Sequence, residues 1–193
     1  MLLPVNIRLP FFTYGIFKPG QLGYLAIKDL VSKTSALSAP GFLNVRDGIP
    51  LFVKSNYSEK TEGHLIYANN KNMKIIYQKI SDFEPHNQYI WGEVNVLNNN
   101  KSDMKVNILL GKSPNRGSSS LMEDYWDSKV HDKIFSVGFE IIHEILDKNK
   151  DSDFRSLYYL QMGYLFLWTI IERYTTMRYT LGNSLELKHN GLI

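Results

Sequence analysis

Glu84 and the loop that begins at Tyr14 contain the residue types best suited to catalysis. Residues 9–17 form an apolar run that predicts a buried strand, and the turn residues up to Gly20 then open a helical stretch. Such a corner leaves backbone N–H groups unpaired, and Gly15 and Gly20 carry no Cβ, so a ligand can approach closely. With a helix N-terminus behind it, the loop suits a carboxylate or an oxyanion formed during acyl transfer. An ordinary strand–turn–helix corner is the alternative interpretation.

Glu84 stands between Phe83 and Pro85, just past the end of a predicted helix. Apolar neighbours raise the pKa of a carboxyl group, and a general base that works near neutral pH needs such a shift. A solvated glutamate at a helix end would have the same local sequence. The catalytic interpretation therefore depends on whether the fold brings Glu84 and the Tyr14 loop together.

The elements that would position these residues alternate along the first half of the chain. Strands are expected over 9–17, 61–68, 89–97 and 105–110, and a further one in the short apolar runs bracketed by hairpin turns near 40–50. Helices are expected over 21–32 and 71–83. Five strands and two helices in this order predict an α+β fold, a compact mixed sheet that closes toward a barrel.

The composition changes after residue 110. Residues 111–120 are rich in Gly, Ser and Pro and predict a loop or linker, and a helical period follows them. A polar turn over 147–153 separates two long helices, the second running from 154 to 181, so we expect an antiparallel helical hairpin. The expected domains are residues 1–112 and a linker with a helical segment over 113–193.

Composition excludes several classes of function. The 193 residues include no cysteine, which rules out disulfides and thiolate chemistry, and the five histidines show no zinc-type spacing. The net charge of +3 comes without a dense basic run, so nucleic acid is not an expected partner. The apolar stretch 157–171 is too short to span a bilayer and predicts a buried helix. Without a signal-like N-terminus, a cytoplasmic location is expected.

Four motifs of the first half, in this order, resemble the gamma-glutamylcyclotransferase-like family over residues 9–110. The family's Tyr-Gly-x-Leu-x-x-Gly-type loop is matched by Tyr14-Gly15-Ile16-Phe17-Lys18-Pro19-Gly20, and its Gly-x-Pro segment by Gly48-Ile49-Pro50. A Val-x-Gly-Glu-Leu-Tyr-like strand follows as Thr61-Glu62-Gly63-His64-Leu65-Ile66-Tyr67. Its Leu-Asp-x-x-Glu and Tyr-x-Arg motifs are matched by Ile80-Ser81-Asp82-Phe83-Glu84 and Tyr89-Ile90-Trp91.

The resemblance implies a lyase-type cyclotransferase that needs neither a metal nor an organic cofactor. Glu84 would be the general base in a reaction that converts a gamma-glutamyl amine or peptide to 5-oxoproline and a free amine. The residues implied in binding this small-molecule substrate are Tyr14, Gly15, Ile16, Phe17, Gly20 and Tyr89. Because the attacking amine and the carbonyl belong to one molecule, positioning would supply much of the rate.

The chain also departs from the family pattern. Ile16 and Phe17 replace a small residue and Leu, His64 stands where Glu is common, and Trp91 where Arg is common. The alternative is therefore a catalytically inactive ligand-binding or regulatory module of the same fold that oligomerises through its C-terminal helices.

The helices after residue 113 lie outside that family's usual domain. Residues 163–181 faintly resemble helices of HEPN-type domains, which often act as ribonucleases through Arg-x4–6-His. No Arg and His stand at that spacing, so an inactive HEPN-like or simple packing helix pair is expected rather than a nuclease. Since only two long helices are present, a homodimer through the C-terminal helices is a plausible expectation.

Overall fold

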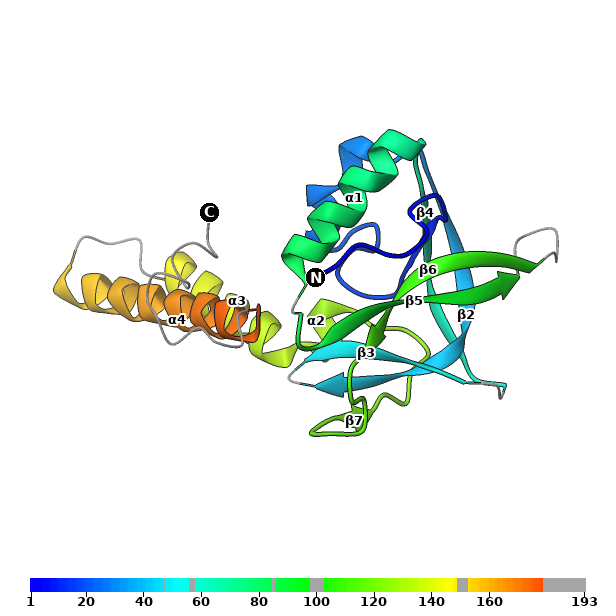
Figure 1. The fold of residues 1–193 in the computed structure, drawn as a ribbon. Helices are drawn as coiled ribbons and strands as arrows, with labels where there is room; N and C mark the ends of the chain where they lie inside the picture. The colour runs from blue at the N-terminus through cyan, green and yellow to red at the C-terminus, as the bar shows by residue number, and fades with distance from the viewer. Residues whose placement is uncertain (47, 56–57, 85, 98–102, 149–152, 179–193) are drawn as a thin grey trace. The chain divides into compact units, whose positions relative to one another are not determined.

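A computed structural model describes residues 1–46, 48–55, 58–84, 86–97, 103–148 and 153–178. The chain divides into two compact units, Met1–Asp127 and Ser128–Ile193. The first holds the sheet and the second is helical (Figure 1).

The first unit is built on one seven-stranded mixed sheet. Its strands are β1 (Phe11–Thr13), β2 (Lys33–Arg46), β3 (Ile49–Lys54), β4 (Lys60–Tyr67), β5 (Tyr89–Leu97), β6 (Asp103–Gly111) and β7 (Ser119–Ser120). The order is β3-β2-β4-β1-β6-β5, with β7 pairing the outer part of β2. Only the β1–β6 pair is parallel among the described strands.

Strand β2 bends sharply, and its two parts pair with different neighbouring strands. Its first part, Lys33–Pro40, pairs with β4, and its second part, Gly41–Arg46, pairs with β3. Gly41 has φ +149°, and a Cβ there would lie 2.4 Å from the carbonyl oxygen of Val53, so only glycine fits the bend. The bend brings β2 near β5 and β3 near β6, which curls the sheet toward a barrel. The expected α+β class with a near-barrel mixed sheet is confirmed.

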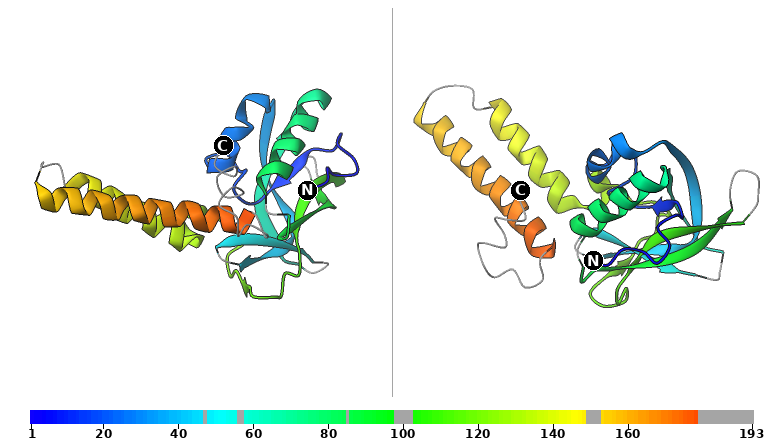
Figure 2. Two further views of the ribbon diagram at one scale, coloured as in Figure 1. Left: turned by 60° about the vertical axis from the view of Figure 1, so that its left-hand side comes forward. Right: turned by 45° about the horizontal axis from the view of Figure 1, so that its top comes forward.

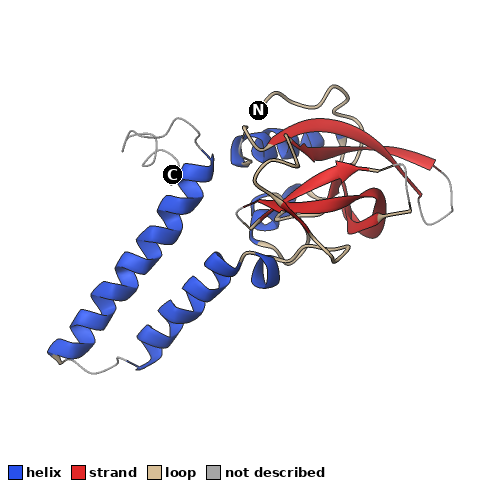
Figure 3. Ribbon diagram, turned by 90° about the horizontal axis from the view of Figure 1, so that it is seen from below, coloured by secondary structure: helices blue, strands red, loops and turns tan. Residues whose placement is uncertain are grey.

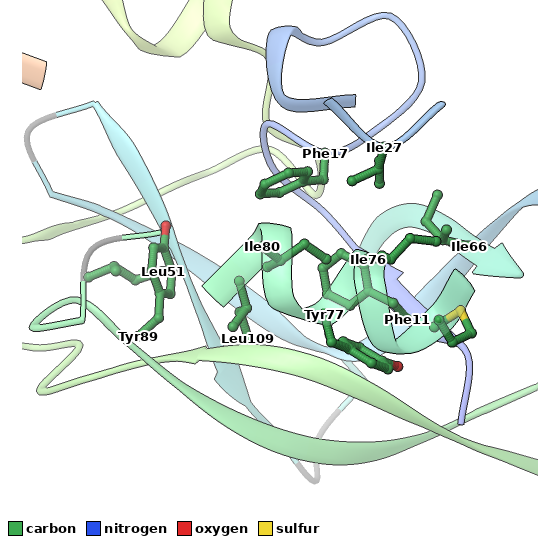
Figure 4. Packing of buried hydrophobic residues seen from close by; sticks show 11 residues of the cluster. Phe11, Phe17, Ile27, Leu51, Ile66, Ile76, Tyr77, Ile80, Tyr89 and Leu109 are labelled. Carbon is green, nitrogen blue, oxygen red and sulfur yellow. The ribbon is translucent and has the colours of Figure 1, made fainter. Parts of the chain in front are cut away.

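One amphipathic helix, α1 (Asn70–Phe83), covers the outside of the sheet. The side chain of Asn69 caps it by accepting the backbone N–H of Asn72. Its inward residues Met73, Ile76 and Tyr77 are at most 2% exposed and pack with aromatic residues of β1 and the following loop (Figure 4). A second cluster fills the inside of the curled sheet, with Phe12, Leu65, Ile108 and Trp126 among its members.

The α-helix expected over residues 21–32 is wrong, because this segment forms 3₁₀ turns. The structure has two 3₁₀ turns, Leu22–Ala26 and Lys28–Leu30, in which Leu22 and Leu25 are more than half exposed, whereas Leu30 packs against the first core cluster. Gly23 and Ile27 face inward instead, because a Cβ at residue 23 would lie only 3.0 Å from the carbonyl oxygen of Ile16. These turns are too short to develop a helix dipole, so they add no anion site to the preceding loop.

Residues 113–127 pack against the sheet, whereas the sequence predicted a linker for part of them. Strand β7 pairs with Asn44 and Val45, and Leu121 donates its N–H to Leu43 at 2.8 Å. Trp126 is 3% exposed inside the second cluster. The structure thus places the unit boundary after Asp127, where the sequence led us to expect one after residue 112.

The second unit consists of a short helix, α2 (Ser128–His131), and a hairpin of α3 (Lys133–Lys148) and α4 (Phe154–Arg178) (Figures 2 and 3). Gly138 lies against Ile170, and Gly163 against Ile145, so α3 and α4 are antiparallel. The expected helical hairpin is therefore present, while residues 179–181 of the expected second helix lie outside the described residues. No helix in the described part of the chain combines the length and apolarity needed to cross a membrane.

Candidate functional site

Tyr14 anchors the loop that follows β1. Its ring is 4% exposed, its hydroxyl donates to the carbonyl of Leu109 at 2.8 Å, and it accepts the backbone N–H of Phe52 at 3.3 Å. Burial raises the pKa of Tyr14 well above 10, the Phe52 N–H opposes that shift, and the nearby Glu84 carboxylate adds to it. The phenol is therefore neutral at physiological pH and holds β3 and β6 beneath the loop.

The loop after Tyr14 presents unpaired backbone donors. Lys18 donates its N–H to the carbonyl of Gly15 at 3.1 Å, which closes a tight turn. Within the described part of the chain, the backbone N–H groups of Gly15, Ile16 and Phe17 have no acceptor in hydrogen-bond range. Successive main-chain donors without acceptors are the kind of group that can bind a carboxylate or an oxyanion.

Glu84 lies at the end of α1, close to this loop. It is the C-terminal cap residue of the helix, donates its N–H to Ile80 at 2.9 Å, and is 8% exposed. The ring of its neighbour Phe83 packs edge-on against Phe17, with centroids 5.4 Å apart. The Phe83–Phe17 contact joins the end of α1 to the loop, and the Glu84 carboxylate is near enough to Tyr14 to raise the pKa of the phenol.

Tyr89 joins the site through Pro50. The Tyr89 hydroxyl donates to the carbonyl of Pro50 at 2.6 Å, and a Cβ on Gly15 would lie 3.3 Å from the Pro50 ring. The Gly-x-Pro segment thus contacts both the loop and the start of β5. Gly20 is exposed, with φ +86° and open space around a Cβ built on it, so it shapes the turn at the end of the loop.

Sequence reasoning missed a clamp beside Tyr89. Arg46 donates to the side chain of Gln88 at 2.9 Å and to the carbonyls of Lys112, Ser113 and Arg116. Gln88 is 6% exposed and also accepts the N–H of Lys112 through its carbonyl at 2.7 Å. The guanidinium therefore fixes the strand ends next to the site, and no local pattern in the sequence signals this partnership.

Trp126 ties the chain beyond β6 to the same loops. Its indole N–H donates to the carbonyl of Gly48 at 3.0 Å, and its own carbonyl accepts the Lys18 ammonium. The side chain of Gln21 donates to Asp127 at 2.9 Å. Burial lowers the pKa of Lys18, an effect opposed by the charge of Asp127. The segment before Asp127 therefore braces the Tyr14 loop from outside.

The two clearest departures from the family pattern have different surroundings. Trp91 is a packing residue, with its ring against Tyr77 at 5.2 Å and its indole N–H donated to Ser81 at 3.2 Å. His64 has a buried Nδ1 without a partner in the described part of the chain, and burial together with the Lys18 charge lowers its pKa. The ring is therefore mainly neutral near neutral pH.

Among the described residues, no group of three or more His, Asp or Glu side chains is arranged to hold a metal ion. The chemistry available at this site is thus that of one carboxylate, the free main-chain donors and the aromatic residues that support them.

Comparison with known proteins gives similarity in structure only. No protein-family model and no curated protein sequence matches the chain. Among solved structures, YkqA from Bacillus subtilis aligns at 13% identity and a TM-score of 0.46, over 67% of this chain and 42% of that one. The uncharacterized protein PH0828 from Pyrococcus horikoshii aligns at 13% identity and a TM-score of 0.45, over 68% of this chain and 96% of that one. A gamma-glutamyl cyclotransferase aligns at 11% sequence identity and a TM-score of 0.41, over 95% of this chain and 98% of that one.

The chain thus spans less than half the length of YkqA. Similarities this weak do not assign a function to the chain. The HEPN-type resemblance of the second unit gains no support from these structures.

Proposed function

We propose that the first unit is a gamma-glutamylcyclotransferase-like enzyme that releases 5-oxoproline and an amine from a gamma-glutamyl substrate. The observation that carries the proposal is a nearly buried carboxylate, Glu84, beside a loop with three successive free N–H donors. This combination supplies a proton acceptor and an oxyanion or carboxylate site within one small region.

In the proposed reaction, Glu84 takes a proton from the substrate's α-amino group as its nitrogen attacks the γ-carbonyl carbon. The C–N bond of the new five-membered ring forms, and the carbonyl oxygen becomes an oxyanion. When the tetrahedral intermediate collapses, the old amide C–N bond breaks and the proton held by Glu84 passes to the departing amine. Atoms and charges balance without an oxidant or a cofactor.

Each remaining residue has a role that follows from its contacts. The N–H groups of Gly15, Ile16 and Phe17 bind the substrate carboxylate or the oxyanion, and Tyr14 fixes the loop through its two hydrogen bonds. Tyr89 holds the Pro50 segment against Gly15. In this proposal the enzyme acts on small molecules in the cytoplasm.

The test is 5-oxoproline release from a panel of gamma-glutamyl dipeptides and amines. Glu84→Gln keeps the shape of the side chain and removes its basicity, so the rate should fall roughly 10²- to 10⁴-fold. Glu93→Gln is the matched control, since Glu93 lies on β5 in a partly exposed ion pair with Lys105 at 3.3 Å. Equal rates for the Glu84 variant and wild type would refute the assignment of the base.

A ligand-binding module without catalysis is the second candidate, and Phe17 favours it. This bulky side chain stands where the family has Leu, is 1% exposed, and packs against Phe11 and against Phe83, the neighbour of Glu84. Calorimetric titration with the same panel separates the two functions. Heat of binding without any 5-oxoproline release would favour the binding module.

A further inference from the structure

Helix α4 has two sides, and α3 covers only one of them. Ser156, Gly163 and Ile170 are buried, one every seven residues, and Gly163 and Ile170 contact α3. With 3.6 residues per turn, the residues on the opposite side of α4 are fixed by this stripe. They include Leu157, Tyr158, Gln161, Tyr164, Leu165 and Trp168, which we call the outer face. Glu172 lies on the same side of α4, one turn after Trp168 and outside this set.

The outer face is apolar and exposed. The exposed fractions of its large hydrophobic residues are 52% for Leu157, 56% for Tyr158, 66% for Tyr164, 55% for Leu165 and 43% for Trp168. None of its six residues carries a charge. A shallow hollow of about 480 Å³ is lined by Leu160, Gln161, Tyr164 and Leu165. A helix of an isolated hairpin normally presents charged residues on this side.

We propose that the outer face binds the outer face of a second copy of this chain, so that two hairpins form a four-helix dimer. This inference is independent of the proposed catalytic activity. In a two-fold dimer each surface meets its own copy, so a face with a net charge would repel itself. The six residues of the outer face are uncharged and mostly apolar, so two copies of this face can pack together without charge repulsion.

Gln161 favours a second copy over an unrelated partner. It is the only outer-face residue with an amide, and an amide carries both a donor and an acceptor, so two copies can pair reciprocally across a two-fold axis. A single polar residue in an apolar helix seam also fixes register in helical assemblies. A Lys or Glu at this position would meet a like charge.

The available area is sufficient for a dimer. If each of the six side chains buries about 100 Å², the two copies together bury roughly 1,200 Å², at the lower end of stable protein interfaces. Three of the six residues, Tyr158, Tyr164 and Trp168, belong to the types that contribute most to binding energy at interfaces.

The first test measures the mass of the full-length protein in solution by light scattering. Wild type should have twice the monomer mass of 22.3 kDa at micromolar concentration. Leu165→Glu buries an unpaired charge in the interface and should raise the dissociation constant roughly 100-fold or more. Arg155→Glu places the same residue at an exposed position of α4 away from the outer face and should leave the dimer intact. Unchanged helicity by circular dichroism checks that each variant folds.

The second test uses a nearly isosteric change whose charge depends on pH. Gln161→Glu should be monomeric at pH 7, where two carboxylates would face each other, and dimeric below about pH 4, where they are protonated. Because the chain has no cysteine, Gln161→Cys introduces the only thiol and should form an interchain disulfide on oxidation, whereas Arg155→Cys should not.

Two results would overturn the proposal. A wild-type protein that stays monomeric at all concentrations would mean that the outer face does not bind a second copy. A dimer that withstands both Leu165→Glu and Gln161→Glu at pH 7 would use another surface.

Discussion

The two units of this protein use aromatic residues in opposite ways. In the first unit Phe11, Phe17 and Tyr77 are at most 2% exposed, and the rings of Phe17 and Tyr77 both pack edge-on against Phe11. On α4 of the second unit, Tyr164 is 66% exposed and Trp168 is 43% exposed. The first unit has enough packed layers to bury its apolar surface. In a hairpin of two helices each helix covers only one side of the other, so the opposite side of an apolar helix stays exposed.

This contrast predicts that aromatic residues of the first unit stabilise the single chain, whereas those on the outer face of α4 contribute to association. Substitutions of buried aromatics in the first unit should affect folding of the single chain. Substitutions on the outer face of α4 should affect what the chain binds, with little effect on the folding of the hairpin itself. The following predictions sharpen or break this distinction, beginning with the largest effect.

The largest effect on the stability of the first unit should come from the position at which the chain is truncated. A protein ending at Asp127 keeps β7 and Trp126 and should fold cooperatively, while one ending at residue 112 loses both and should fail to fold or melt at a far lower temperature. Thermal unfolding followed by circular dichroism distinguishes them. Equal melting temperatures would mean that residues 113–127 are dispensable, as a linker would be.

Trp126→Ala should cost about 3–5 kcal/mol of unfolding free energy, because it removes a fully packed indole from the barrel interior. Trp168→Ala, on the exposed side of α4, should cost the single chain less than about 1 kcal/mol. Denaturant unfolding at a concentration too low for association gives both values. Similar losses at the two positions would break the contrast between the units.

The sequence predicted elements well where their periodicity was strong. Strand β5 occupies the expected residues 89–97, and α1 begins one residue before the expected 71, because both carry a clear apolar pattern. The pattern around Trp126 could be assigned to the following helix just as well. Its true partner, the interior of the sheet, is set by tertiary contacts that no local rule contains.

The candidate site could be predicted only in outline. The turn after Tyr14 was visible in the sequence, but the hydrogen bond from its hydroxyl to Leu109 spans 95 residues and depends on the register of β1 and β6. The clamp formed by Arg46 and Gln88 was missed for the same reason. The catalytic role of Glu84 remains a proposal that the assay above decides.

Tyr14→Phe should cost about 1–3 kcal/mol of unfolding free energy, since it removes both hydrogen bonds of the hydroxyl and leaves the buried Leu109 carbonyl and Phe52 N–H without this partner. If Tyr14 serves to hold the loop, the rate of 5-oxoproline release should fall far less than in Glu84→Gln. The pH dependence of the remaining activity should not change, because the phenol stays protonated throughout. A rate loss as large as that of Glu84→Gln would instead place the hydroxyl in the reaction.

The smallest effect should come from His64 in acid. Its pKa is below the ordinary 6.5 in the folded state because burial and Lys18 disfavour the charged ring, so the unfolded chain binds the proton more readily. The contribution of His64 is therefore fully present above about pH 6.5 and is lost as the pH falls through the lower folded pKa. His64→Gln should flatten this part of the stability curve, measured by urea unfolding between pH 7.5 and about pH 5. An unchanged slope in the variant would show that other groups of the first unit set its sensitivity to acid.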